Sequence, residues 1–110
     1  MNITQLSPTF KVSPQITVDD VTEAKEQGIA VIVCNRPDGE SDDQIPAADI
    51  RRACESAGIK FVELPMNGPN YSPEQVSTLK SLIDDGSNIL AYCRTGNRSS
   101  ILYNATQGSN

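Results

Sequence analysis

Histidine and tryptophan are both absent from this chain of 110 residues, and its aromatic residues are limited to three Tyr and two Phe. Without histidine, zinc sites that mix Cys and His are excluded, as is any nucleophile activated by a histidine base. The three cysteines are odd in number and show no paired spacing, which favours a reducing compartment over a disulfide framework. We therefore expect an aliphatic core, a cytoplasmic location, no metal and no other cofactor.

Positive charge is also scarce, because 9 Lys and Arg face 14 Asp and Glu for a net charge of −5. This balance argues against nucleic acid or an anionic membrane as the main partner. No apolar run approaches the roughly 18–20 residues of a membrane-spanning helix. The first residues also lack the basic and then apolar layout of a signal peptide. Any anion-binding site must therefore be built locally from a few residues.

Glycine and proline divide the chain into alternating segments of strand and helix character. Expected strands are residues 10–12 (a short edge strand), 29–34, 59–64 and 89–92; expected helices are residues 18–27, 47–57, 73–85 and a short one that begins near Arg98. Residues 1–8 are polar and are expected to be frayed. The alternation predicts a single α/β domain over residues 1–110, with three layers and a central, largely parallel sheet of four or five strands flanked by helices.

Two polar loops follow strands of this predicted sheet. Residues 29–34 form a continuous run rich in β-branched residues, as in parallel strands that are buried on both faces. A loop begins after this run at Asn35, and another begins after residues 89–92 at Cys93. Ligands of such sheets bind outside the carboxyl ends of the strands. We therefore expect the two loops to lie on one rim and to form the site.

The loop from Cys93 carries the parts of an anion-binding thiol site. Gly96 lies among small or polar residues, so successive N–H groups can turn inward around an anion. A helix that begins near Arg98 adds its positive end, and the guanidinium can hold two oxygens. These surroundings would lower the thiol pKa from about 8.5 toward roughly 3.5–7.5. Ser99 is predicted to donate a hydrogen bond to the thiolate, and the expected anion ligands are Arg94, Thr95, Gly96, Asn97 and Arg98.

The pattern Cys93-x-x-Gly96-x-Arg98-Ser99 resembles the loops of two enzyme classes. Protein tyrosine and dual-specificity phosphatases usually place five residues between Cys and Arg. Rhodanese-type sulfurtransferases commonly place four, as here, so spacing alone favours sulfur transfer through a Cys93 persulfide. Rhodaneses also carry a Gly-His-Ile-like segment, however, which a chain without histidine cannot match.

Segments elsewhere in the chain extend the resemblance. They are Val12-x-x-Gln15-Ile16, Gly28 to Val33, Asn35-Arg36-Pro37-Asp38-Gly39-Glu40, Ala57-Gly58-Ile59 and Leu64-Pro65. Together they are similar to a small bacterial phosphatase-like domain that also occurs fused to beta-lactamase-like hydrolases and is distantly similar to dual-specificity phosphatases. The resemblance covers about residues 8 to 103. It implies a protein-tyrosine-phosphatase-like fold, Cys93 as nucleophile, Arg98 as phosphate clamp and a phosphate-bearing substrate, either a protein or a small molecule.

A general acid is the part that the sequence supplies least clearly. Phosphoester cleavage needs a proton for the leaving oxygen, and larger phosphatases carry an Asp for this purpose on a separate loop. Residues 65–71 form the best-placed loop but contain no carboxylate, which leaves Asp38 and Glu40 as substitutes. Either could instead belong to a solvated acidic turn. Arg36 is a candidate second contact to phosphate or a surface ion pair of little energetic value.

Three functions therefore stay open: a phosphatase of weak activity, a sulfurtransferase, and a non-catalytic anion-binding module. Only a dozen residues follow Arg98, and residues 107–110 are not expected to extend the last helix. That helix is expected to be short or replaced by a contact with another chain, which leaves a homo-oligomer open.

Overall fold

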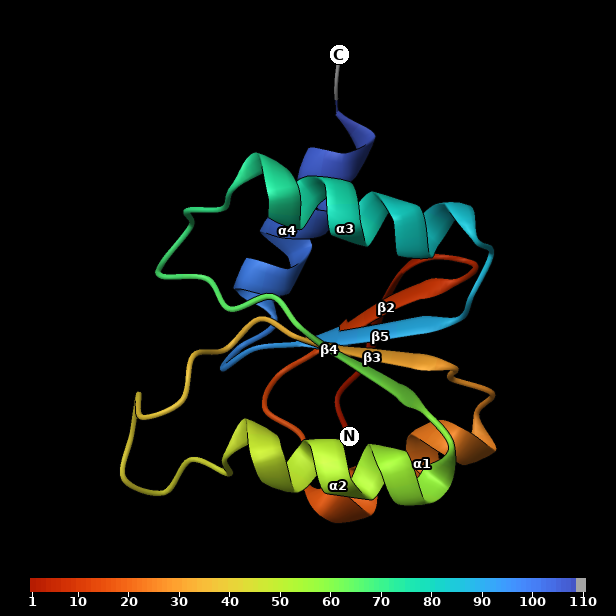
Figure 1. Ribbon diagram of the computed structural model, residues 1–110, viewed down its shortest axis with the longest axis vertical. Helices are drawn as coiled ribbons and strands as arrows, with labels where there is room; N and C mark the ends of the chain where they lie inside the picture. Colours follow the sequence, from red (N-terminus) through yellow and green to blue (C-terminus); the bar gives the residue numbers. More distant parts are fainter. Residues whose placement is uncertain (109–110) are drawn as a thin grey trace.

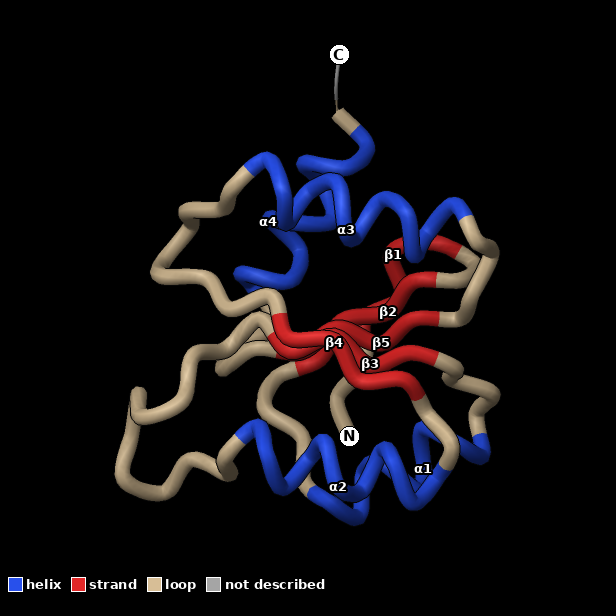
Figure 2. Tube along the Cα trace, in the orientation of Figure 1, coloured by secondary structure: helices blue, strands red, loops and turns tan. Residues whose placement is uncertain are grey.

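The computed structural model describes residues 1–108, which form a five-stranded sheet between two layers of helices (Figures 1 and 2). The strands are β1 (Thr4–Ser7), β2 (Phe10–Ser13), β3 (Val31–Cys34), β4 (Lys60–Glu63) and β5 (Ile89–Tyr92). The helices are α1 (Val18–Glu26), α2 (Ala47–Ala57), α3 (Pro73–Asp84) and α4 (Asn97–Gln107). Figure 1 shows α1 and α2 on one face of the sheet and α3 and α4 on the other. The predicted three-layer α/β fold is confirmed.

The sheet order is β1-β2-β5-β3-β4, and the four strands β2 to β5 run parallel. The expectation that residues 1–8 are frayed is wrong, because β1 pairs antiparallel with β2, with Thr4 opposite Val12. In consequence β2 is an interior strand and not the edge strand that we expected. The polar sequence of β1 lies at the edge of the sheet, where a strand can remain exposed and needs few apolar side chains.

Hydrophobic side chains fill both spaces between the sheet and the helices. Along β3, Ile32 and Cys34 belong to the core cluster beneath α1 and α2, whereas Val31 and Val33 belong to the cluster beneath α3 and α4. Successive side chains of a strand point to opposite faces, so a strand buried on both sides has an uninterrupted apolar sequence. Tyr92 at the end of β5 belongs to the first of these clusters.

Local signals placed most helix ends correctly. The side chains of Thr17 and Ser72 cap α1 and α3 in reciprocal capping boxes, and Gly58 follows α2 with a φ of 75°. The expectation of a short last helix is wrong: α4 has 11 residues, as many as α2. The expectation that residues 107–110 do not extend this helix is wrong for Gln107, which is the last residue of α4, and its part on Ser109 and Asn110 lies outside the described residues. Within residues 1–108, no helix has both the length and the apolar character needed to cross a membrane.

Candidate active site

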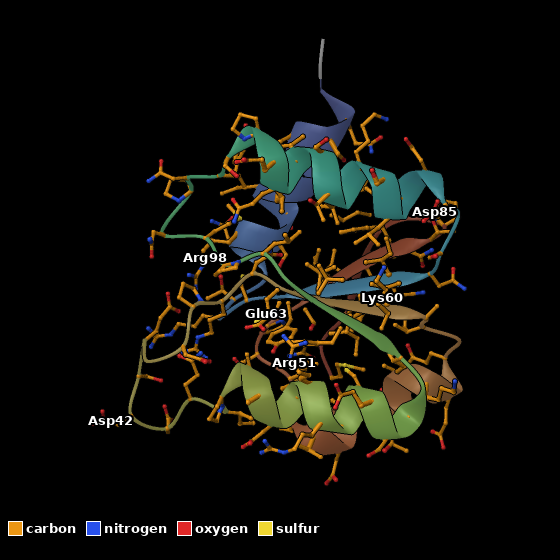
Figure 3. All side chains as sticks on the ribbon, viewed as in Figure 1. Asp42, Arg51, Lys60, Glu63, Asp85 and Arg98 are labelled. Atoms are coloured by element: carbon orange, nitrogen blue, oxygen red, sulfur yellow. The ribbon has the colours of Figure 1, made fainter. Side chains whose placement is uncertain are left out.

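The two polar loops lie side by side on one rim of the sheet, as predicted. The backbone N–H of Asn35 donates to the carbonyl of Tyr92 over 2.8 Å, which joins the end of β3 to the end of β5. The long loops over residues 36–46 and 65–72 extend from the same edge of the sheet, and Arg98 lies between them (Figure 3). The rim therefore brings residues from three distant parts of the sequence together.

Backbone N–H groups surround the thiol of Cys93 at the end of β5. The N–H of Gly96 donates to Cys93 Sγ over 3.0 Å. Burial raises the pKa of the thiol, but hydrogen bonds from the N–H groups of Ser99, Thr95, Gly96 and Arg98 outweigh burial, and the pKa is lowered below its usual value. Two of these groups belong to the first turn of α4, whose N–H groups have no partner within the helix. The loop is therefore built to hold negative charge.

Gly96 makes this geometry attainable. It precedes α4 with a φ of 94°, a conformation that L side chains rarely adopt. A Cβ at this position would lie 3.4 Å from the carbonyl carbon of Ser13 at the end of β2. The N–H of Gln15 also donates to the carbonyl of Arg94 over 3.3 Å. The loop thus rests directly on the segment that follows β2.

Arg98 extends from α4 toward the two long loops. Its Nη1 donates to Glu40 Oε2 over 2.7 Å and to the carbonyl of Met66 over 2.9 Å, and its Nη2 donates to Glu40 Oε1 over 2.8 Å. A guanidinium has five N–H donors, so Nε–H and one Nη2–H take no part in these three contacts. Glu40 and, to a smaller extent, Cys93 raise the pKa of Arg98. The edge formed by Nε and Nη2 is thus suited to two oxygens of an oxyanion.

Arg36 is a buried support of this arrangement, and its ion pair with Glu40 is not the surface pair considered from the sequence. Its side chain is 4% exposed. Nε donates to Glu40 Oε1 over 3.0 Å, Nη1 to Gln15 Oε1 over 2.9 Å and Nη2 to Ser41 Oγ over 3.3 Å. The hydrogen bond from Arg98, assisted by that from Arg36, lowers the pKa of Glu40 to about 2. Arg36 therefore holds an ionised Glu40 against Arg98.

The structure gives Asp38 a role different from the predicted general acid. Asp38 Oδ1 accepts the N–H of Ala47 over 2.9 Å. Ala47 begins α2, and the preceding Pro46 has no side chain that can cap the helix. Asp38 thus caps α2 from the preceding loop, and its negative charge at a helix N-terminus is favourable.

Ser99 also differs from its prediction, because its hydroxyl does not serve the thiolate. The Ser99 side chain is fully buried, and Oγ donates to Asn35 Oδ1 over 2.8 Å. Asn35 Nδ2 in turn donates to the carbonyl of Leu64 over 2.9 Å, which fixes Oδ1 as the acceptor. Since a hydroxyl has one proton, the contribution of Ser99 to Cys93 is its backbone N–H.

Of the remaining predicted anion ligands, Thr95 and Gly96 present their backbone N–H groups to the Cys93 thiol. The Arg94 side chain is exposed. Thr95 Oγ1 accepts the N–H of Asn97 over 3.3 Å, which shapes the start of α4. Sequence reasoning missed Asn35 and Gln15 as supports of the site. A signal was present for both, because Asn35 directly follows a buried strand and Gln15 belongs to a segment of the family resemblance.

The fold is an α/β fold of the protein-tyrosine-phosphatase-like kind, and it places a thiol and an arginine at the carboxyl end of a parallel strand. The chain belongs to the family described as "Beta-lactamase hydrolase-like protein, phosphatase-like domain", whose model matches residues 2–110. The predicted resemblance to this family is confirmed.

Known relatives place the domain within longer proteins. A beta-lactamase hydrolase-like protein of Agrobacterium fabrum is 23% identical over 94% of this chain and 24% of its own length. One of Xylella fastidiosa is 27% identical over the same two shares. The chain thus spans about a quarter of the length of these curated relatives.

Solved structures show the same fold. A candidate phosphatase from Neisseria meningitidis Z2491 is 36% identical, with a TM-score of 0.84 over 100% of this chain and 81% of that chain. TpbA of P. aeruginosa, solved as a C132S variant in complex with pTyr, has a TM-score of 0.69 at 19% identity over 99% of this chain and 66% of that chain. The second likeness is one of fold alone.

Proposed function

We propose that this domain is a cysteine-dependent phosphatase in which the Cys93 thiolate attacks the phosphorus of a phosphoester. The observation that carries the proposal is the cradle of backbone N–H groups that lowers the pKa of the Cys93 thiol. A thiolate is the nucleophilic form of cysteine, and the N–H groups that favour it can also hold the oxygens of a bound phosphate. Membership of a phosphatase-like family supports the same chemistry.

The arginine supplies the second part of the proposed mechanism. Arg98 has its Nε–H and one Nη2–H available for the phosphate, while Glu40 and Met66 fix the rest of the guanidinium. Arg36 keeps Glu40 in place through the hydrogen bond from its Nε to Glu40 Oε1. The side chains of this network carry two positive charges and one negative charge, so a net positive charge remains for the phosphate in an acidic protein. Water then hydrolyses the phosphocysteine and restores the thiolate.

Access to the thiol requires a local movement. Cys93 is 0% exposed, so a phosphate has to displace the groups that cover the sulfur before attack. The long loops over residues 36–46 and 65–72 frame this edge of the molecule (Figure 1).

Phosphate release from p-nitrophenyl phosphate by the wild type and by Cys93→Ser tests the proposal. The matched control is Cys54→Ser, since burial raises the pKa of the Cys54 thiol to about 11 and keeps it protonated. We expect release by the wild type and by Cys54→Ser and none by Cys93→Ser. Release that survives Cys93→Ser would contradict the proposed nucleophile.

A sulfurtransferase is the second candidate, and the four-residue spacing between Cys93 and Arg98 favours it. Thiocyanate formation from thiosulfate and cyanide measures that activity on the same proteins. Cys93-dependent thiocyanate without phosphate release from any phosphoester would replace the phosphatase by this candidate. If both assays give no product while vanadate still binds, the domain is an anion-binding module.

A further inference from the structure

The carboxylates of the loop after β3 are either held by other groups of the protein or lie at the tip of the loop. Asp38 caps α2, and Glu40 is held between two arginines. Asp43 Oδ1 accepts the Ser41 hydroxyl over 2.8 Å. Asp42 lies at the tip of the loop, far from Arg98 (Figure 3). Residues 36–46 contain no further Asp or Glu.

Glu40 lies closest to the site but carries no proton to give. A general acid must be protonated when the leaving oxygen departs. Arg98 and Arg36 lower the pKa of Glu40 to about 2, so the carboxylate is ionised at neutral pH. Both of its oxygens already accept hydrogen bonds from guanidinium groups. Glu40 is therefore a positioning residue for Arg98.

The other loop at the rim, residues 65–71, supplies an acceptor and no carboxylic acid. Its carbonyl at Met66 binds Arg98 Nη1 over 2.9 Å, and the N–H of Met66 donates to the carbonyl of Asn35 over 3.0 Å. The loop reads Pro-Met-Asn-Gly-Pro-Asn-Tyr. Tyr71 is its one residue with an ionisable side chain, and that side chain is 46% exposed.

From this arrangement we propose that the substrates of the site are activated phosphoryl compounds, whose leaving oxygen departs as a stable anion without receiving a proton. Phosphoric anhydrides, acyl phosphates and aryl phosphates of acidic phenols share this property. The inference rests on the proposed phosphatase function and narrows its substrate class. Phosphate esters of simple alcohols, phosphoserine included, fall outside the class because an alkoxide is a poor leaving group.

The step balances without an acid. The bond from Cys93 Sγ to phosphorus forms while the bond from phosphorus to the leaving oxygen breaks, and the electron pair of the broken bond departs with that oxygen. Water then attacks phosphorus, and the P–S bond breaks with its electron pair returning to Sγ. The proton that the water loses passes to solvent. Arg98 and the loop N–H groups hold the phosphoryl oxygens through both steps.

The dependence of kcat/KM on the leaving group tests the inference. A general acid raises the rate by about 10²- to 10⁴-fold, and most of this gain falls on substrates with poor leaving groups. Because the site has no such acid, we expect kcat/KM to fall by about 100-fold or more from p-nitrophenyl phosphate to phenyl phosphate, whose phenolate is the poorer leaving group. Acetyl phosphate, an acyl phosphate, should be hydrolysed readily and glycerol phosphate should not. A kcat/KM that is nearly the same for both aryl phosphates would overturn the inference while leaving the Cys93 mechanism intact.

Two variants test whether Glu40 or Tyr71 acts as a general acid. Glu40→Gln should lower kcat/KM by the same factor for p-nitrophenyl and phenyl phosphate, because Glu40 acts through Arg98. Tyr71→Phe should leave the ratio between the two substrates unchanged. A loss confined to phenyl phosphate in either variant would identify that residue as the acid and overturn the inference. Phosphate release that does not depend on Cys93 would instead overturn the proposed function.

Discussion

Replacing Ser99 by alanine separates the role of its hydroxyl from that of its backbone N–H. The hydroxyl donates to Asn35 Oδ1 over 2.8 Å inside the protein, and Ser99 is fully buried. Ser99→Ala leaves this oxygen without its partner, and an unsatisfied buried polar group costs about 1–3 kcal/mol. Domains of this kind are stable by roughly 5–15 kcal/mol, so the loss is measurable. The N–H of residue 99 is retained, so the pKa of the Cys93 thiol should not change.

Urea unfolding gives the free energy, and a pH titration of thiolate absorbance gives the pKa of the thiol. Asn35→Ala is the matched variant and should cost more, because it leaves both the Ser99 hydroxyl and the carbonyl of Leu64 without a partner. The double variant should then cost less than the sum of the two, since the residues are in contact. A loss below about 0.5 kcal/mol, which is typical of surface positions, would refute this assignment of the hydroxyl. So would a raised pKa of Cys93 in Ser99→Ala.

Two further predictions concern the backbone of the Cys93 loop and the stability of the protein at acidic pH. Gly96→Ala should weaken vanadate binding and should lower the free energy of unfolding more than Gly39→Ala does. The angle φ is positive at both glycines, but only at Gly96 would an added Cβ contact backbone atoms, those of Ser13. Equal losses of stability in the two variants would show that crowding against Ser13 does not matter. The pKa of Glu40 is about 2 when folded, against about 4.3 unfolded, so its stabilisation is complete above about pH 4.3 and is lost as the pH falls toward 2. Urea unfolding should therefore show that Glu40→Gln loses less stability than the wild type over that range, and parallel losses would contradict the ion pairs.

Segments whose structure depends on near neighbours in sequence were predictable. The capping boxes at Thr17 and Ser72 and the strand at residues 89–92 agree with the structure, because each follows from side chains within a few positions. The position of Cys93 on the rim was predictable for a related reason. Parallel strands that alternate with helices place their carboxyl ends at one edge, whatever the details of packing.

Contacts between distant residues were not predictable from patterns. Strand β1 is held by backbone pairing with β2, which requires no apolar sequence. Arg36 is buried because Gln15, 21 positions earlier, accepts from its guanidinium. Asp38 caps a helix that begins nine residues later. In each case the residue type is equally compatible with exposure to solvent and with the observed contact. Only the packed structure distinguishes these two possibilities.

The prediction for Ser99 named the wrong atom. Its position beside Cys93 was correct, but the atom that faces the thiol is its backbone nitrogen. The hydroxyl instead donates to Asn35 Oδ1. Spacing along the sequence carries no information on this contact.

Detection of phosphate on Cys93 tests the proposed covalent mechanism. The full chain is mixed with p-nitrophenyl phosphate, quenched rapidly in acid and analysed by peptide mass spectrometry. We expect a phosphocysteine at Cys93 that forms within the first turnover and is absent in Cys93→Ser. Phosphate release without a covalent adduct, at a rate that Cys93→Ser does not change, would contradict this mechanism.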